Sequence, residues 1–109
     1  MEEVLSVTEA VEMCDNDEEF MKEMVVLMRE DLVSCLDLLA DAFRTKNSTQ
    51  MKEISHRVKG QAANMAAKEL WKWSKKVEDA AGAGVCTRSE YLRLVLSIKE
   101  FVRCTRNVS

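Results

Sequence analysis

One run of the sequence constrains the fold more than any other. Between Met21 and Ala42, apolar side chains recur at three- and four-residue steps, which places them on one face of an α-helix because a helix turns by about 100° per residue. Asp17, followed by two glutamates, can cap the free amide groups at the start of such a helix. We therefore predict a long helix from Asp17 to about Arg44, whose buried stripe comprises Met21, Val25, Met28, Leu32, Cys35, Leu39 and Ala42.

The rest of the chain also favours helices. It contains no proline and only three glycines, and it is rich in strong helix formers but poor in clusters of the β-branched and aromatic residues that mark strands. The sequence predicts a short helix over Thr8 to Met13, a helix capped by Ser48, a helix over Ala67 to Ala81, and a last helix capped by Thr87 or Ser89. We expect an all-α domain over residues 1–109, an antiparallel up-and-down four-helix bundle with a short additional N-terminal helix.

Helical spacing also predicts which side chains of the last three helices point inward. The expected buried residues are Met51, Ile54, Val58, Ala62 and Met65 in the first of them; Leu70, Trp73 or Ser74, Val77 and Ala81 in the next; and Leu92, Val95 or Leu96, Ile98 or Lys99, and Val102 in the last.

The cysteines and the N-terminus bear on the environment of the protein. Cys14, Cys35, Cys86 and Cys104 are far apart, without the close pairs that bind zinc or perform thiol chemistry. We expect buried thiols in a reducing compartment. The start of the chain has no basic leader before an apolar run, and the longest apolar stretch, residues 24–28, is too short to span a bilayer. We therefore expect a soluble, cytoplasmic protein.

Charge is unevenly distributed along the chain. Residues 1–43 carry 13 acidic and two basic side chains, whereas residues 52–76 carry seven basic and two acidic ones. These cations either form solvated helix faces or attract an acidic partner, and the sequence leaves both readings open. Nucleic-acid binding is a weaker reading, because the chain is acidic overall and has no recognition motif. The basic residues concerned are Lys52, Arg57, Lys68, Lys72, Lys75 and Lys76.

The only histidine, His56, lies in this basic zone. On a helix, three of the expected buried residues fall within roughly 20° of the direction opposite His56, so the ring must point to solvent. Lys52, Lys59, Gly60 and Ala63 share its outward stripe. A mid-helix glycine costs roughly 1 kcal/mol relative to alanine, and at this position it clears space for an approaching partner. A neutral imidazole is nucleophilic, and a nearby ammonium stabilises a phosphoryl group.

The run His56-Arg57-Val58-Lys59-Gly60, followed by Ala66-Ala67 and Leu70, resembles the signature of histidine-containing phosphotransfer (HPt) domains. The resemblance covers roughly residues 5–105, including the acidic start of the long helix and the segment from 77 to 82. Three positions depart from the family pattern. Ala66 stands where the family usually has glycine, Gln61 where it often has serine or another small residue, and Val58 where leucine is common.

The resemblance implies a phosphorelay. His56 would accept a phosphoryl group from a receiver-domain aspartate or a histidine kinase and pass it to a response-regulator receiver, Lys59 would stabilise the phosphoryl group, and Gly60 and Ala63 would give the partner access. It implies a non-catalytic phosphocarrier, since no kinase or nucleotide-binding motif is present. It also implies no cofactor, with Mg²⁺ held by the receiver partner, a hybrid histidine kinase upstream, and a monomer that binds neither nucleic acid nor membrane.

Several residues around the histidine have two readings. Lys52 and Arg57 are docking candidates or plain solvated charges. Met24 and Met28 either pack in the core or form an adaptable docking patch. Gln61 and Glu78 are candidates for orienting the ring, although a surface salt bridge explains Glu78 equally well. We expect no metal site, because no second histidine is present. The alternative function is a helical interaction module that binds receivers without relaying phosphate.

Overall fold

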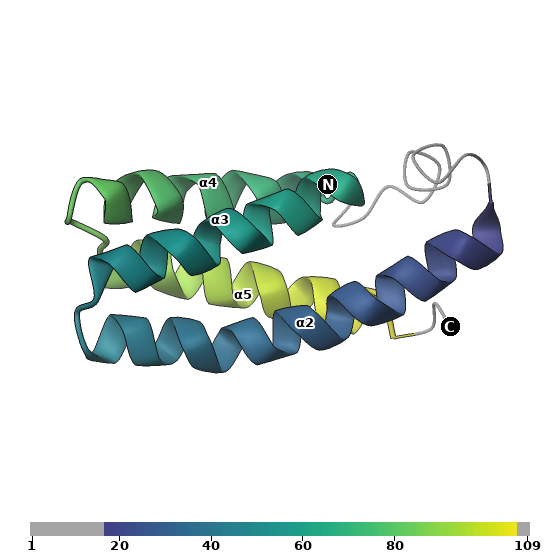
Figure 1. Ribbon diagram of the computed structural model, residues 1–109, viewed down its shortest axis with the longest axis horizontal. Helices are drawn as coiled ribbons and strands as arrows, with labels where there is room; N and C mark the ends of the chain where they lie inside the picture. Colours follow the sequence, from purple (N-terminus) through teal and green to yellow (C-terminus); the bar gives the residue numbers. More distant parts are fainter. Residues whose placement is uncertain (1–16, 107–109) are drawn as a thin grey trace.

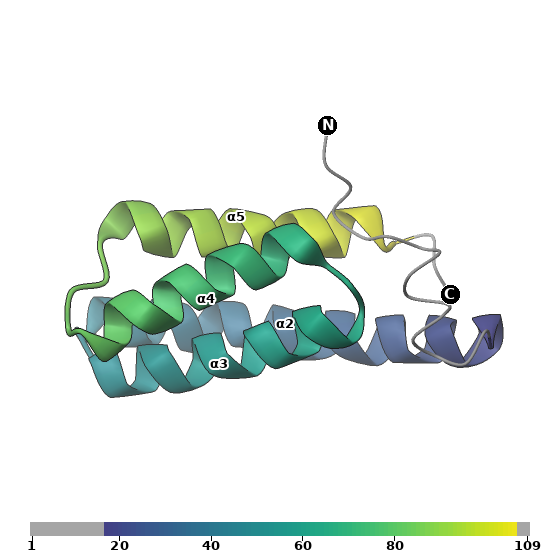
Figure 2. The ribbon, with the colours of Figure 1, turned by 90° about the horizontal axis from the view of Figure 1, so that it is seen from above.

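A computed structural model describes residues 17–106, which form four α-helices and no strand. The helices are α2 (Glu18–Arg44), α3 (Ser48–Asn64), α4 (Lys68–Gly82) and α5 (Arg88–Cys104). Each runs antiparallel to the one before it, and α5 closes the bundle against α2 (Figures 1 and 2). The predicted fold class is confirmed, and the helix expected over residues 8–13 lies outside the described part of the chain.

The starts of α2, α3 and α5 have side-chain caps, one of them shifted by a residue from the prediction, and α4 starts after Ala67 without one. The Asp17 side chain accepts a hydrogen bond from the Phe20 amide at 3.0 Å, as predicted. At α3 the cap is Asn47 rather than Ser48, because the Asn47 side chain accepts from the Gln50 amide at 3.0 Å. Both residue types cap well, so the sequence could not decide between neighbours. At α5 the cap is Thr87, which forms a reciprocal capping box with Glu90.

Helices α2, α3 and α4 end in the same way. In each case an amide just beyond the helix donates to the carbonyl five residues back, at 2.9 Å, across a residue in the left-handed conformation. That residue is Gly84 at the end of α4, where φ is 77°, but Lys46 after α2 and Ala66 after α3, where φ is 55° and 54°. The chain therefore does break after α3, although Ala66 adopts there a conformation that disfavours a side chain.

The core confirms the predicted faces of the first three helices. All seven predicted α2 residues are buried, as are all five predicted from residue 51 to residue 65. In α4 the buried choice is Ser74, whose hydroxyl donates to the Leu70 carbonyl at 2.6 Å, while Trp73 is partly buried against the core. Met65 joins α3 to the N-terminal half of α2 by packing with Met21, Val25 and Met28 in a second cluster.

The predicted face of α5 is largely wrong. Leu94, Ile98 and Phe101 are fully buried, whereas Leu92 is 41% and Leu96 60% exposed. Val95 and Val102 are partly buried. Apolar residues occupy both sides of this helix, so spacing alone fits two stripes about half a turn apart. Packing against α4 and α2 selects the stripe through Leu94. Only Ile98 is both among the predicted residues and fully buried in the structure.

The thiols differ from one another in exposure. Cys35 is buried, Cys86 is partly buried and Cys104 is exposed, and all three are free. The prediction of buried thiols is therefore confirmed for Cys35 and wrong for Cys104, while Cys14 lies outside the described residues. Over residues 17–106, no helix has the length and apolar character needed to cross a membrane.

Candidate functional site

The imidazole of His56 projects from the outer face of α3. Its side chain is 69% exposed, while Ile54, Val58 and Met65 on the opposite side of the helix are buried. The outward orientation predicted from helical spacing is thus confirmed. A protein partner can reach the ring directly from solvent.

Glu78 of α4 fixes this ring. Its Oε2 lies 2.6 Å from His56 Nδ1, and its side chain is only 12% exposed. A carboxylate can only accept, so Nδ1 must carry the hydrogen of this bond. In the neutral ring the lone pair is then on Nε2. This contact fits the ring-orienting reading of Glu78, and an ion pair with Lys59 fits the salt-bridge reading as well.

The same carboxylate also binds Lys59. The Lys59 Nζ atom lies 2.6 Å from Glu78 Oε1, and the lysine side chain is 24% exposed, less than its place on the outward stripe suggested. Burial alone would raise the pKa of Glu78, but hydrogen bonds from Lys59 and His56, together with their charges, outweigh burial and lower that pKa. An ionised carboxylate therefore holds both the imidazole and the ammonium.

The helix surface beside the ring is open. Gly60 and Ala63 are exposed on the face that carries His56, one and two turns further along α3. A Cβ atom added to Gly60 would have nothing within 4 Å. The fold therefore does not require glycine here. The missing side chain instead leaves the surface beside His56 more accessible from solvent. Lys52 is also exposed on this stripe, and its aliphatic chain lies near Gly82 at the end of α4.

A second polar cluster lies on the other side of α3. Asp31 of α2 accepts hydrogen bonds from Arg57, whose Nε is 3.1 Å from Asp31 Oδ2, and from the Gln61 amide. Gln61 therefore turns toward α2 and not toward His56, so the proposed ring-orienting role of Gln61 is wrong. Arg57 remains half exposed beside the histidine. Sequence reasoning missed Asp31, because nothing in the sequence relates the rotation of α2 to that of α3.

The two methionines proposed for docking differ. Met28 is 6% exposed and packs in the cluster with Met65, so it is a core residue and cannot offer a docking surface. Met24 is partly buried at the edge of that cluster and keeps some accessible surface. Leu27 lies on the exposed side of α2 and is 61% exposed.

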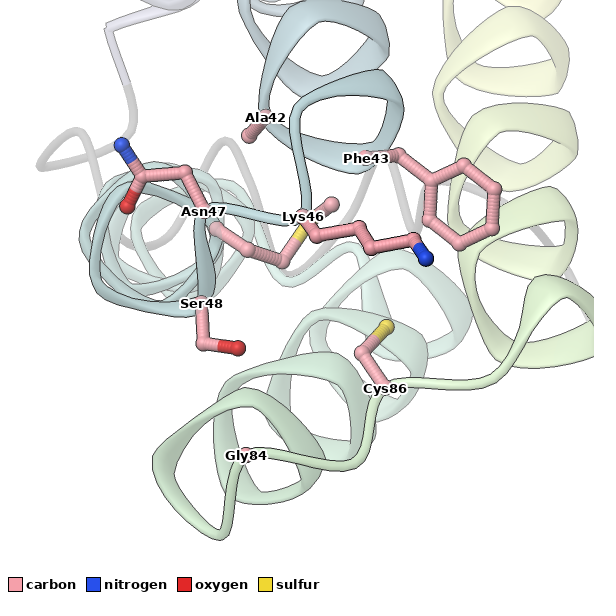
Figure 3. Close-up of a pocket in the computed structure, with 8 residues that line it drawn as sticks. Ala42, Phe43, Lys46, Asn47, Ser48, Gly84 and Cys86 are labelled. Carbon is pink, nitrogen blue, oxygen red and sulfur yellow. The ribbon is translucent and has the colours of Figure 1, made fainter.

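A hollow at one end of the bundle offers no comparable chemistry. The α2–α3 turn and the loop before α5 enclose about 330 Å³, lined in part by Phe43, Lys46 and Cys86 (Figure 3). Burial, followed by the nearby charge of Glu90, raises the pKa of the Cys86 thiol, so the thiol is a poor nucleophile. In the described part of the chain, no group of three histidine, cysteine or acidic side chains could hold a metal ion. The histidine face is therefore the candidate site.

A family model and two solved structures match this chain. The family model of the Hpt domain matches residues 23–101. The chain superposes on the HPt domain of a sensor hybrid histidine kinase from Shewanella with a TM-score of 0.87 and 13% identity, over 96% of this chain and 92% of that one. It superposes on histidine-containing phosphotransfer protein B from Pseudomonas aeruginosa with a TM-score of 0.86 and 17% identity, over 97% and 94%.

No curated protein matches the chain. The structural matches show the same helical fold, and the family match covers most of the sequence, including His56, Lys59 and Gly60. Members of this family are phosphocarriers that interact with receiver domains and histidine kinases in two-component signalling. The chain belongs to the Hpt domain family.

Proposed function

We propose that His56 is the phosphoacceptor of a phosphorelay. Nε2 attacks the phosphorus of a receiver's aspartyl phosphate, or of a kinase's phosphohistidine, in line with the bond that breaks. The Nε2–P bond forms as the P–O or P–N bond to the donor breaks, and the donor leaves as a carboxylate or an imidazole. The phosphoryl group then passes to the aspartate of a response-regulator receiver. The exposed ring with Nδ1 bound to Glu78 carries this proposal.

Glu78 supports the transfer in two ways. It keeps the proton on Nδ1, so the nucleophilic lone pair is on the exposed nitrogen. Attack by Nε2 also places positive charge on the ring, and the carboxylate 2.6 Å from Nδ1 stabilises that charge. Glu78 is a positioning residue here, because it acts through the imidazole and not on phosphorus.

Lys59 supplies the nearby cation. Its ammonium is bound to the carboxylate that holds Nδ1 of the ring, and we propose that it stabilises the negative charge of a phosphoryl group on Nε2. Gly60 and Ala63 leave room for the receiver, and we propose that the exposed Lys52 and Arg57 and the partly exposed Met24 also contact it. We expect this protein to position the phosphoryl group while the receiver's own acidic residues hold Mg²⁺.

In this role the protein is a carrier without catalytic activity of its own. It needs no cofactor and acts as a monomer in the cytoplasm. The alternative is a helical module that binds receivers and relays nothing. Both share the fold and the open face, and they differ in whether His56 carries phosphate.

The variant His56→Gln separates the two. After incubation with a phosphorylated receiver, the wild-type protein should carry a phosphate that is labile to acid and stable to alkali, and the variant should carry none. Circular dichroism must show that the variant stays folded, which we expect because the side chain is exposed. Equal receiver binding with no phosphate on the wild-type protein would favour the interaction module.

A further inference from the structure

A cluster of cations surrounds Trp73 on the side of α4 that faces α5. The Lys76 Nζ atom lies 4.7 Å from the centre of the indole ring, Lys72 Nζ lies 5.3 Å from it, and the Arg93 guanidinium carbon lies 5.6 Å from it. Each distance is within the range of a cation–π contact. Cations from two helices therefore meet at one aromatic ring.

Two of these cations have no carboxylate partner in the part of the chain that the structure describes. Among residues 17–106, neither Lys76 nor Arg93 forms an ion pair, whereas Lys72 lies 3.9 Å from Glu69. The Glu69 carboxylate also accepts the indole N–H at 3.2 Å. The indole face offsets part of the repulsion between the like charges, but it carries no net charge. The cluster keeps an excess of positive charge that an anionic group would neutralise.

The cluster borders a hollow with an apolar side. About 310 Å³ is enclosed between α4 and α5 by Glu69, Trp73, Arg93, Leu96, Ser97 and Glu100. Leu96 is 60% exposed at its edge. Glu100 accepts hydrogen bonds from Arg103 at the end of α5, so its charge is already matched. The hollow thus combines one unpaired cation, Arg93, with an aromatic ring and an exposed leucine, and the unpaired Lys76 lies at the same indole ring.

This hollow, which we call the α4–α5 groove, is separate from the face of α3 that carries His56. Helix α4 contacts α3 along one side and α5 along the other (Figure 2). Glu78 contacts His56 on the α3 side, and Trp73 lies with Arg93 on the α5 side. A ligand in the groove would leave the imidazole accessible.

We propose that the α4–α5 groove binds an acidic peptide segment of a partner protein, in which carboxylates pair with Lys76 and Arg93 and an apolar side chain packs on Trp73 and Leu96. Charge complementarity favours this occupant, because both unpaired charged groups at Trp73 are cations, while the lining residues Glu69 and Glu100 are already bound to Lys72 and Arg103. The inference is independent of phosphate relay, since none of its residues contacts His56.

The test uses the full chain with Trp71→Phe, so that Trp73 is the only indole and its fluorescence reports on the groove. The probe is a capped synthetic peptide that repeats the unit glutamate, glutamate, leucine. We expect saturable binding that weakens with salt and that falls about tenfold in Lys76→Gln/Arg93→Gln, as expected when two charge pairs are lost. His56→Gln should bind the peptide normally.

A matched control removes the same charge elsewhere. Lys46→Gln/Lys75→Gln has the same net charge, and it should keep the wild-type affinity. Equal weakening by both double variants would show attraction to net charge alone and overturn the proposal, as would the absence of saturable binding. Binding to phosphatidylserine vesicles but not to the peptide would also overturn it in favour of a membrane surface. Phosphate transfer in Lys76→Gln/Arg93→Gln reports separately on the relay.

Discussion

Two carboxylates bind α3 from opposite sides, and they have different consequences. Glu78 of α4 contacts His56 and Lys59, while Asp31 of α2 contacts Arg57 and Gln61. In both cases one acidic side chain holds two polar side chains that lie about one turn apart. What differs is the partner, because only Glu78 contacts a group that still presents a nucleophilic atom to solvent. A carboxylate between two helices can therefore leave a reactive atom exposed or leave none, depending on which side chain it holds.

The largest expected effect is a difference in the rate of phosphoryl transfer between variants of Glu78 and variants of Asp31. Glu78→Ala should slow phosphoryl transfer through His56 by about 10–100-fold, because a hydrogen bond to a charged group contributes about 1.5–3 kcal/mol. Asp31→Ala should change the rate by less than about twofold. Timed transfer from a phosphorylated receiver measures both. Glu78→Gln keeps an acceptor oxygen and should fall between wild type and Glu78→Ala, and equal slowing by the Glu78 and Asp31 variants would erase the distinction.

Asp31 should matter more for the stability of the protein than for the rate of phosphoryl transfer. Asp31→Ala removes the acceptor of Arg57 and of the partly buried Gln61 amide, so we expect the free energy of unfolding to fall by about 1–3 kcal/mol. Urea denaturation measures the loss. Asp37→Ala removes an exposed acid from the same helix and should stay within about 0.5 kcal/mol of wild type. A loss at Asp31 no larger than that control would mean that the cluster does not hold α2 to α3.

Asp31 variants are easier to compare with Glu78 variants in a more stable protein. A substitution at the end of α3 should provide one. Ala66 has a φ of 54°, and glycine adopts that conformation without the steric cost of a Cβ, so Ala66→Gly should raise the free energy of unfolding by about 1 kcal/mol. The matched change Gly84→Ala, at a φ of 77°, should lower it by a similar amount. Opposite signs in thermal or urea denaturation confirm the reading, and Asp31 variants can then be assayed for transfer while fully folded.

The smallest effect is in the pH dependence of stability. Lysine and histidine hold the pKa of Glu78 below its ordinary value, so the stabilisation from its ionised form is complete above the unfolded-state pKa and is lost as pH falls through the folded-state pKa. Glu78→Gln should therefore lose less stability than wild type on acidification from pH 7 to below about pH 4. Denaturation at both pH values measures the difference. Parallel losses in the two proteins would contradict an ionised Glu78 that holds both Lys59 and His56.

Local chemistry made most of the bundle predictable. The stripe of α2 and the inward face of α3 follow from spacing, and the outward direction of His56 follows from them by geometry. The last helix was not predictable in the same way, because Leu92 and Leu94 start two apolar stripes and only contact with the other helices selects one. Where a helix has one apolar side its orientation can be read from sequence, and where it has two it cannot.

The candidate site was predictable in its centre and less so at its borders. His56, Lys59 and Gly60 lie on one helix, so their relative positions follow from helical geometry alone. The contacts of Glu78 and Asp31 depend on how α4 and α2 are rotated against α3, which no spacing within one helix determines. For the same reason Gln61 could equally have faced the ring or α2, and the structure places it on α2.

Gly60 has a consequence for anyone who engineers this protein. Nothing lies within 4 Å of the position that its Cβ would occupy, and alanine is the better helix former by about 1 kcal/mol. A programme that selects variants by melting temperature would therefore exchange this glycine early and register a gain. The substituted protein would look improved in every stability assay, and if the proposed function holds, a receiver would approach His56 less easily.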